Sequence, residues 1–419
     1  MQVLETLQSA AKVTELRKKI LFTLMMFLVF RLGAHIPVPG INNEVLTQMM
    51  QNNLFGFFDI VSGGAFKKFT IFAMGIMPYI NASIIMQLLT VVIPSLEKLA
   101  KEGEEGRKKI VQFTRYGTVV LGLVQAIGMV IYLKNALLQA NIWSYIVVVI
   151  SLTAGTAFLM WLGELITEKG IGNGISLIIF AGIVSRIPSG AYNMYQYVKA
   201  GEVGIFSIIA FLIIAVIVIA GVVAIHEGQR RIPVQYAKRV VGRRVYGGQS
   251  THIPLKVNQA GVIPVIFAMS ILLFPSTIAS WFPTNKFAMF ITSVFNFRSV
   301  WYMIMYALLI IFFAYFYTAV TFNPTDVAEN MKKYGGFIPG LRPGRPTAEY
   351  IEKVLNRVTL AGGIFLAFIA LLPNLVFATT KLNLQFGGTS LLIVVGVALE
   401  TMKQLESQLL MRHYQGFMK

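Results

Sequence analysis

Residues that could carry out bond chemistry are few and widely separated in this 419-residue chain. Cysteine is absent, which excludes thiol catalysis, cysteine-bound metals and disulfide bonds. The four histidines, His35, His226, His252 and His413, lack the spacing of metal ligands, and we interpret them as loop or interface residues. The sequence therefore predicts no catalytic site, no metal site and no cofactor.

Three glycines, Gly170, Gly172 and Gly174 in EKGIGNGIS, superficially resemble a phosphate-binding loop. No Lys-Ser/Thr pair follows them, however, and they join two strongly apolar segments. We interpret this stretch as a tight turn between two helices.

The composition indicates a membrane protein. Hydrophobic residues make up 56% of the chain and charged residues only 13%, whereas about a quarter of the residues in a soluble domain are charged. Long apolar stretches without a central charge predict ten membrane-spanning helices, at 20–36, 69–94, 113–133, 143–164, 175–188, 205–226, 260–282, 301–322, 358–378 and 386–402. The predicted fold class is therefore an all-α polytopic membrane protein.

Basic residues concentrate on one side of this topology. The side with both termini and the connections near 95–112, 165–174, 227–259 and 323–357 collects 27 of the 36 Lys and Arg residues, which leaves nine for the other side. Because positive charge marks the cytoplasmic side, we expect both termini in the cytoplasm.

Ten spans divide into two sets of five, which enter the membrane from opposite faces because five is odd. The halves, 20–190 and 191–402, can therefore be related as inverted repeats with a pathway between them. An N-terminal cytoplasmic segment, 1–19, and a cytoplasmic tail, 403–419, complete the predicted organisation.

The predicted spans hold almost no ionisable groups near their centres. Arg31, Arg115, Glu164, Arg186 and Glu400 lie towards the ends of their segments. Ion-driven transporters usually carry such groups at mid-membrane, despite an insertion cost of about 2.5 to 3.5 kcal/mol each. A secondary transporter of a small solute is therefore the weaker alternative.

Two long connections on the basic side predict a docking surface. Residues 227–257 carry seven Lys or Arg against one acid, and their alternating pattern predicts a protruding β-hairpin with Arg243 and Arg244 near its tip. The second connection contains GGFIPGLRPGRPT, in which Gly and Pro stiffen the chain around Arg342 and Arg345. Arg243 and Arg244 are candidates for binding phosphate or carboxylate groups. The second connection has six basic and four acidic residues, which favours specific contact over bulk attraction.

The stretch LFGFFDIVSGGAFKKF, at 54–69, is too polar to cross a membrane but apolar enough to seek burial. We predict a short helix that ends at Gly63 and Gly64 and folds back beside the next span. Two interpretations remain open: an interfacial helix at the outer surface, or a movable element that caps a cavity between the halves.

Together these features resemble the SecY/Sec61-alpha family of protein-translocation channels, from about residue 10 to the C-terminus. The most specific stretches are SGGAFKKFTIFAMGIMPYINASIIMQLLTVVIPSLE, ITEKGIGNGISLIIFAGIV, QRRIPVQYAKRVVGRRVYGGQSTHIPLKVNQAGVIPVIFAMSILLFP, YGGFIPGLRPGRPT and FGGTSLLIVV. The resemblance implies ten helices around a central hourglass pore that conducts unfolded secretory polypeptides and releases hydrophobic segments sideways into lipid.

The resemblance also implies roles for particular residues. An apolar pore ring is expected from Ile76, Ile80, Ile175, Ile179, Ile266 and Ile393. The family's plug, within 55–66, matches Phe57, Phe58, Asp59, Ile60, Val61, Ser62, Gly63 and Gly64, although Lys67 and Lys68 depart from the usual bacterial pattern. Asn81 and Gln87 are expected at a lateral gate between the second and seventh spans.

Partners follow from the same resemblance. It implies the small membrane subunits SecE and SecG, with the SecA ATPase or a translating ribosome docked on the basic loops, the latter through ribosomal RNA. Secretory preproteins and nascent membrane proteins would be the substrates, and the bacterial plasma membrane the location.

Overall fold

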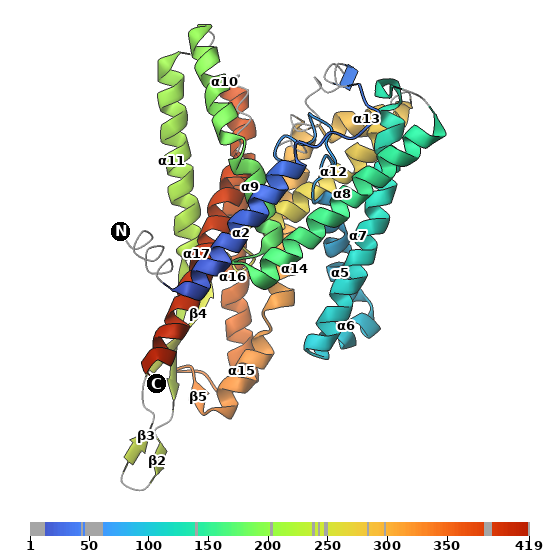
Figure 1. Cartoon of the computed structure of the whole chain (residues 1–419). Coiled ribbons are helices and arrows are strands. Elements are labelled where there is room, and N and C mark those ends of the chain that lie inside the picture. The colour runs from blue at the N-terminus through green and yellow to red at the C-terminus, as the bar shows by residue number, and fades with distance from the viewer. Residues whose placement is uncertain are drawn as a thin grey trace.

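The computed structural model describes residues 13–42, 45–46, 62–138, 141–201, 204–236, 239–241, 244–246, 250–282, 285–296, 299–380 and 388–417. Helices dominate, and the strands gather at one end of the bundle (Figure 1). We call this the basic end, because α6, α15 and the strands there carry the Lys- and Arg-rich connections. The opposite end is marked by α10 and α13 (Figure 1).

The helices of the N-terminal half are α2 (Thr14–Gly33), α5 (Met77–Val92), α6 (Pro94–Lys101), α7 (Glu104–Tyr132), the 3₁₀ turn η2 (Lys134–Ala136), α8 (Ile142–Lys169), α9 (Gly174–Val184) and the beginning of α10 (Ile187–Lys199). Those that follow are α11 (Ile205–Glu227), α12 (Ile263–Ser280), α13 (Lys286–Val294), α14 (Val300–Thr321), α15 (Pro324–Lys333), α16 (Arg345–Thr380) and α17 (Gly388–Phe417).

Each of the ten predicted spans coincides with one of these helices, and the predicted fold class is confirmed. Within the described residues, six helical stretches are long and apolar enough to cross a membrane, one of them formed by α9 with α10 and another by α14 with α15. The bent pair of α5 and α6, counted as one span, makes a seventh. The helix α12 is apolar but shorter. The bend between α5 and α6 is 100° and falls at Pro94, which cannot continue the hydrogen bonding of α5.

The predicted start of the second span is wrong. Residues 69–76 form turns, and the helix begins only at Met77. Gly75 has a φ of +58°, which stops a right-handed helix from extending backwards, and Pro78 then fixes the first helical turn. The irregular backbone is tolerated because most of its side chains, such as Phe72 and Met74, are buried in protein.

The predicted β-hairpin is confirmed and extends beyond the prediction. Strand β1 (Gln229–Tyr236) pairs antiparallel with β4 (Ser250–Lys256), and β2 (Arg239–Val241) with β3 (Arg244–Tyr246). The two-residue strand β5 (Gly336–Phe337), from the other long connection, pairs with β1 on its second edge. The two basic connections are therefore hydrogen-bonded into one unit.

A small core holds this unit together. Ile232, Val234 and Leu255 of the sheet are buried against residues of α15 and α16, namely Met331, Ile351 and Leu355. A separate and much larger apolar core lies between the spanning helices and draws residues from both halves of the chain.

Candidate functional site

All six isoleucines expected in the pore ring lie in this large core. Ile76, Ile80, Ile179 and Ile393 are buried, with 1 to 4% of their surface exposed, and Ile175 and Ile266 are half-buried against them. They come from α5 and the turn before it, α9, α12 and α17. Residues up to 317 positions apart (393 − 76) therefore belong to one continuous hydrophobic core, and we refer to these six residues of it as the isoleucine cluster.

A cavity of about 430 Å³ lies on the basic-end side of this cluster. It is enclosed by α5, α7, α8 and α9 of the N-terminal half and by α12 of the C-terminal half. Four of the isoleucines, Ile80, Ile175, Ile179 and Ile266, form part of its wall. The cavity therefore lies between the halves, where the topology predicted a pathway.

Polar side chains of α5, α7, α8 and α9 line part of the cavity, beside the apolar side chains of Val111, Ile263 and Phe267. Arg115 of α7 and Glu164 of α8 form an ion pair in its wall, with Nε 2.8 Å from the carboxylate. Glu164 is 20% exposed and Arg115 is 50% exposed, so the pair is open to water. Because both charged side chains line the cavity, it can hold water and the polar groups of a bound polypeptide. The neighbouring isoleucine side chains can form hydrogen bonds with neither of these.

Sequence reasoning placed Arg115 and Glu164 near the ends of their spans but did not pair them. The signal was present, since two opposite charges stand towards the same side of neighbouring spans. They are 49 positions apart, however, and only the packing of α7 on α8 determines that they meet.

The turn that precedes α9 is fixed by a local cap. The side chain of Asn173 accepts hydrogen bonds from the backbone N–H groups of Ile175 and Ser176. A side chain on Gly174 would overlap the backbone of Gly163 in α8, so the glycine permits close packing of these helices. The glycine-rich stretch is thus a helix junction, as predicted, and it presents Ile175 and Ile179 to the cavity.

Of the two residues expected at the lateral gate, both on α5, only Gln87 lines the cavity. Gln87 lines the cavity opposite Ile263 and Phe267 of α12, and its amide donates to Ser83 Oγ at 3.3 Å. Asn81 is half-buried on the same helix, outside this lining. Helices α5 and α12 are in contact, and the hydroxyl of Ser270 lies 3.8 Å from the sulfur of Met77 across their interface.

A second contact joins the halves near the opposite end. The indole ring of Trp281, which follows α12, lies so close to Gly128 of α7 that a side chain there would overlap it. The absence of a Cβ at Gly128 is therefore what lets the ring lie against the helix backbone.

Of the predicted plug, only Ser62, Gly63 and Gly64 lie within the described residues, and Phe57, Phe58, Asp59, Ile60 and Val61 fall outside them. Gly63 and Gly64 have φ angles of +66° and +90°, a conformation that glycine adopts without strain. Arg31 of α2 donates to the carbonyl of Gly63 at 3.0 Å and to Ser185 Oγ at 3.4 Å. The residues after the glycine pair form turns, with Lys67 and Lys68 exposed.

The expected docking arginines lie at the basic end. Arg342 and Arg345 are exposed, and Arg345 pairs with Glu349 at 3.0 Å. The carbonyl of Arg342 accepts a hydrogen bond from Thr347, which ties this turn to the first turn of α16. Arg244 is at the start of β3, and Arg243 falls outside the described residues.

In the part of the chain that the structure describes, no group of three or more His, Asp or Glu residues is arranged to hold a metal ion. The described residues of the site form a hydrophobic core beside a cavity with both polar and apolar walls.

Comparison with known proteins identifies the family. The SecY family model matches residues 70–402. The protein translocase subunits SecY of Halalkalibacterium halodurans and Aquifex aeolicus are 52% and 45% identical to this chain, and each alignment covers 99% of both sequences.

Solved structures agree with the sequence relatives on the fold. A protein-conducting channel superposes with a TM-score of 0.69 at 21% identity, covering 93% of this chain and 92% of that one. Sec61 in the canine ribosome–channel complex from the endoplasmic reticulum superposes with a TM-score of 0.64 at 20% identity, with the same coverage. The chain is a multi-pass membrane protein and belongs to the SecY family.

Proposed function

We propose that this chain forms a channel through which unfolded polypeptides cross the membrane. The observation that carries the proposal is that six isoleucines lie in the core shared by both halves, and that four of them line a cavity that also has polar walls. A narrow aliphatic ring gives an ion no replacement for its hydration shell, yet it binds no passing side chain tightly. Such a ring suits a channel that must admit any extended polypeptide and exclude small ions.

Sideways release would follow from transfer free energies. A polypeptide segment of about 20 apolar residues is more stable in lipid than in the cavity, whereas a polar segment continues across. The interface of α5 and α12, with Gln87 beside it, is the proposed exit.

The proposal can be tested by crosslinking. Because the chain has no cysteine, single cysteines placed at Ile76, Ile80 and Ile393 are the only thiols in each variant. An arrested secretory chain carrying one cysteine should form disulfides with these positions. The matched control is a cysteine at Ile150, which is 61% exposed on α8 and outside the cluster.

Absence of crosslinks at all three isoleucines, or equal crosslinking at Ile150, would rule out the proposed path. The alternative function, secondary transport of a small solute, predicts saturable uptake into vesicles by the purified protein. The pairing of Arg115 with Glu164 inside the cavity is the observation that favours it.

We propose the basic end as the cytoplasmic docking face for the SecA ATPase or the ribosome, with SecE and SecG as membrane partners. One solved relative was determined as a ribosome–channel complex, and another bound to the yeast 80S ribosome. The exposed Arg342 suits a carboxylate or phosphate of either partner.

Exchanging Arg342 for Glu should reduce SecA-driven export more than it reduces the yield of folded complex. Lys199→Glu, an exposed position on α10 at the opposite end, provides the control and should leave export unchanged. A parallel loss of complex and export in Arg342→Glu would argue against a docking role.

A further inference from the structure

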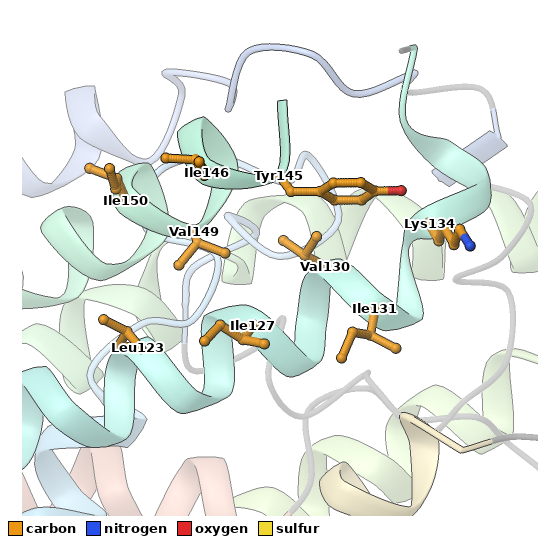
Figure 2. Close-up of a pocket in the computed structure, with 9 residues that line it drawn as sticks. All are labelled: Leu123, Ile127, Val130, Ile131, Lys134, Tyr145, Ile146, Val149 and Ile150. Atoms are coloured by element: carbon orange, nitrogen blue, oxygen red, sulfur yellow. The ribbon is translucent and has the colours of Figure 1, made fainter. Parts of the chain in front are cut away.

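An apolar groove of about 640 Å³ lies between α7 and α8, near the end opposite the basic loops. Its walls are Leu123, Ile127, Val130 and Ile131 of α7 and Tyr145, Ile146, Val149 and Ile150 of α8, with Lys134 at one end (Figure 2). Several of these side chains are exposed, among them Ile131 at 52%. The groove is separate from the cavity beside the isoleucine cluster and shares no lining residue with it.

The length of the groove is close to the hydrocarbon thickness of one membrane leaflet. Leu123 and Ile131 are eight residues apart, about 12 Å along a helix, and Lys134 lies just past the end of α7. Half of a bilayer's hydrocarbon core measures about 15 Å. An extended acyl chain therefore fits along the groove from the level of Lys134 to the level of Leu123.

The polar groups of the groove, Lys134 and the Tyr145 hydroxyl, lie at the end where the headgroup of a bound lipid would be. Figure 2 places Lys134 and the hydroxyl of Tyr145 at the same end of the groove, with Leu123 at the far end. Trp143, at the start of α8, is 72% exposed, and exposed Trp and Tyr residues mark the boundary between lipid and water.

The positive charge of Lys134 has no acidic residue near it in the sequence. Lys134 is the single charged residue in the sequence between 116 and 163, which contains no acid. Among the described residues, no carboxylate pairs with it. A cation at headgroup level above an aliphatic groove is complementary to one ligand class, an anionic phospholipid.

We propose that this groove binds one anionic phospholipid of the leaflet opposite the basic loops. Its acyl chain would lie between α7 and α8, and its phosphate would meet the Lys134 ammonium, with the Tyr145 hydroxyl available as a hydrogen-bond donor. The site would stabilise the packing of these two helices on the side that faces away from the pathway.

The test uses the purified complex in detergent, titrated with an equimolar mixture of phosphatidylglycerol and phosphatidylcholine with identical acyl chains. Native mass spectrometry should detect one retained phosphatidylglycerol. Lys134→Gln should lower its occupancy about fivefold, the effect of one cation near an anionic headgroup, and Lys134→Arg should preserve it. Lys286→Gln is the matched control, because Lys286 is an exposed lysine at the start of α13, at the same end of the bundle.

A second pair of variants tests the groove itself. Ile127→Trp should fill the groove and displace the lipid, whereas Leu212→Trp, on the exposed face of α11, should not. Equal loss of lipid in Lys134→Gln and Lys286→Gln, or equal retention of both lipids by the unaltered protein, would overturn the proposal. So would a photocrosslinker at Ile127 that captures a membrane subunit in place of lipid.

Discussion

Helices α7 and α8 present two unlike surfaces. Towards the basic end they offer Arg115 and Glu164 to a cavity of about 430 Å³ between the halves. Towards the opposite end they offer aliphatic side chains and one lysine to a groove of about 640 Å³. The larger space is the one whose polar groups, Lys134 and the Tyr145 hydroxyl, are confined to one end, so volume alone does not locate the pathway.

The polarity of α7 and α8 therefore changes along their length with the surroundings of each end. Charged groups are stable where water reaches them and costly where lipid does, by about 2.5 to 3.5 kcal/mol per charge at mid-membrane. The charged groups in the wall of the cavity therefore indicate where a hydrated polypeptide can enter. The aliphatic side chains of the groove indicate a surface that contacts lipid.

The largest expected effect comes from making the aliphatic cluster polar. Asparagine at Ile175, Ile266 and Ile393 should raise ion leak about tenfold, because its amide hydrogen-bonds water inside the ring. Asparagine at Ile127 and Ile150, in the groove, should leave leak unchanged. Single-channel currents of the assembled complex in planar bilayers measure this difference. An equal rise in ion leak in both sets of variants would contradict the assignment of the ion barrier to the isoleucine cluster.

An intermediate effect should come from a third face of α7, where Gly128 meets Trp281. Gly128→Ala forces the indole ring away and should destabilise the protein by about 1 to 3 kcal/mol, as overpacking does. Gly122→Ala, six residues earlier, meets only ordinary van der Waals contacts and should be neutral or stabilising. Thermal unfolding in detergent compares the stability of the two variants. Equal stability would show that the Trp281 ring can move away from α7 at little energetic cost.

The smallest effect should come from the ion pair in the cavity. A double-mutant cycle with Arg115→Gln and Glu164→Gln should give a coupling of about 0.5 to 1 kcal/mol that falls as salt is added, since the pair is partly exposed. The exposed pair Arg345–Glu349, treated in the same way, should give a coupling near zero. Equal couplings would mean that the cavity screens charge as well as bulk water does.

Much of the fold follows from the sequence because its signals are local. Each of the ten apolar stretches coincides with a helix, and the alternating pattern predicts the hairpin of β1 and β4. The start of α5 was misjudged because residues 69–76 are as apolar as a helix, and only Gly75 and burial on all sides keep them irregular. The two-residue strand β5 is too short to carry any pattern.

The candidate site depended on a different kind of information. Residue spacing places Ile76 with Ile80 on one helix face, and Ile175 with Ile179 on another. That α5, α9, α12 and α17 contribute to the same core was implied by the family resemblance and is seen only in the folded chain. The pore-ring, plug, gate and docking roles stay predictions. The groove of α7 and α8 was invisible in sequence, since its residues read as ordinary lipid-facing positions.

The pairing of β5 with β1 has a mechanical consequence. The folded block at the basic end joins the chain that leaves α11, the chain that enters α12 and the chain that runs from α14 to α16. A force applied to either connection is therefore shared by four spanning helices, of which α12 borders the isoleucine cluster. Under the proposed docking, a displacement of this block would be transmitted to α12, which contributes Ile266 to the isoleucine cluster.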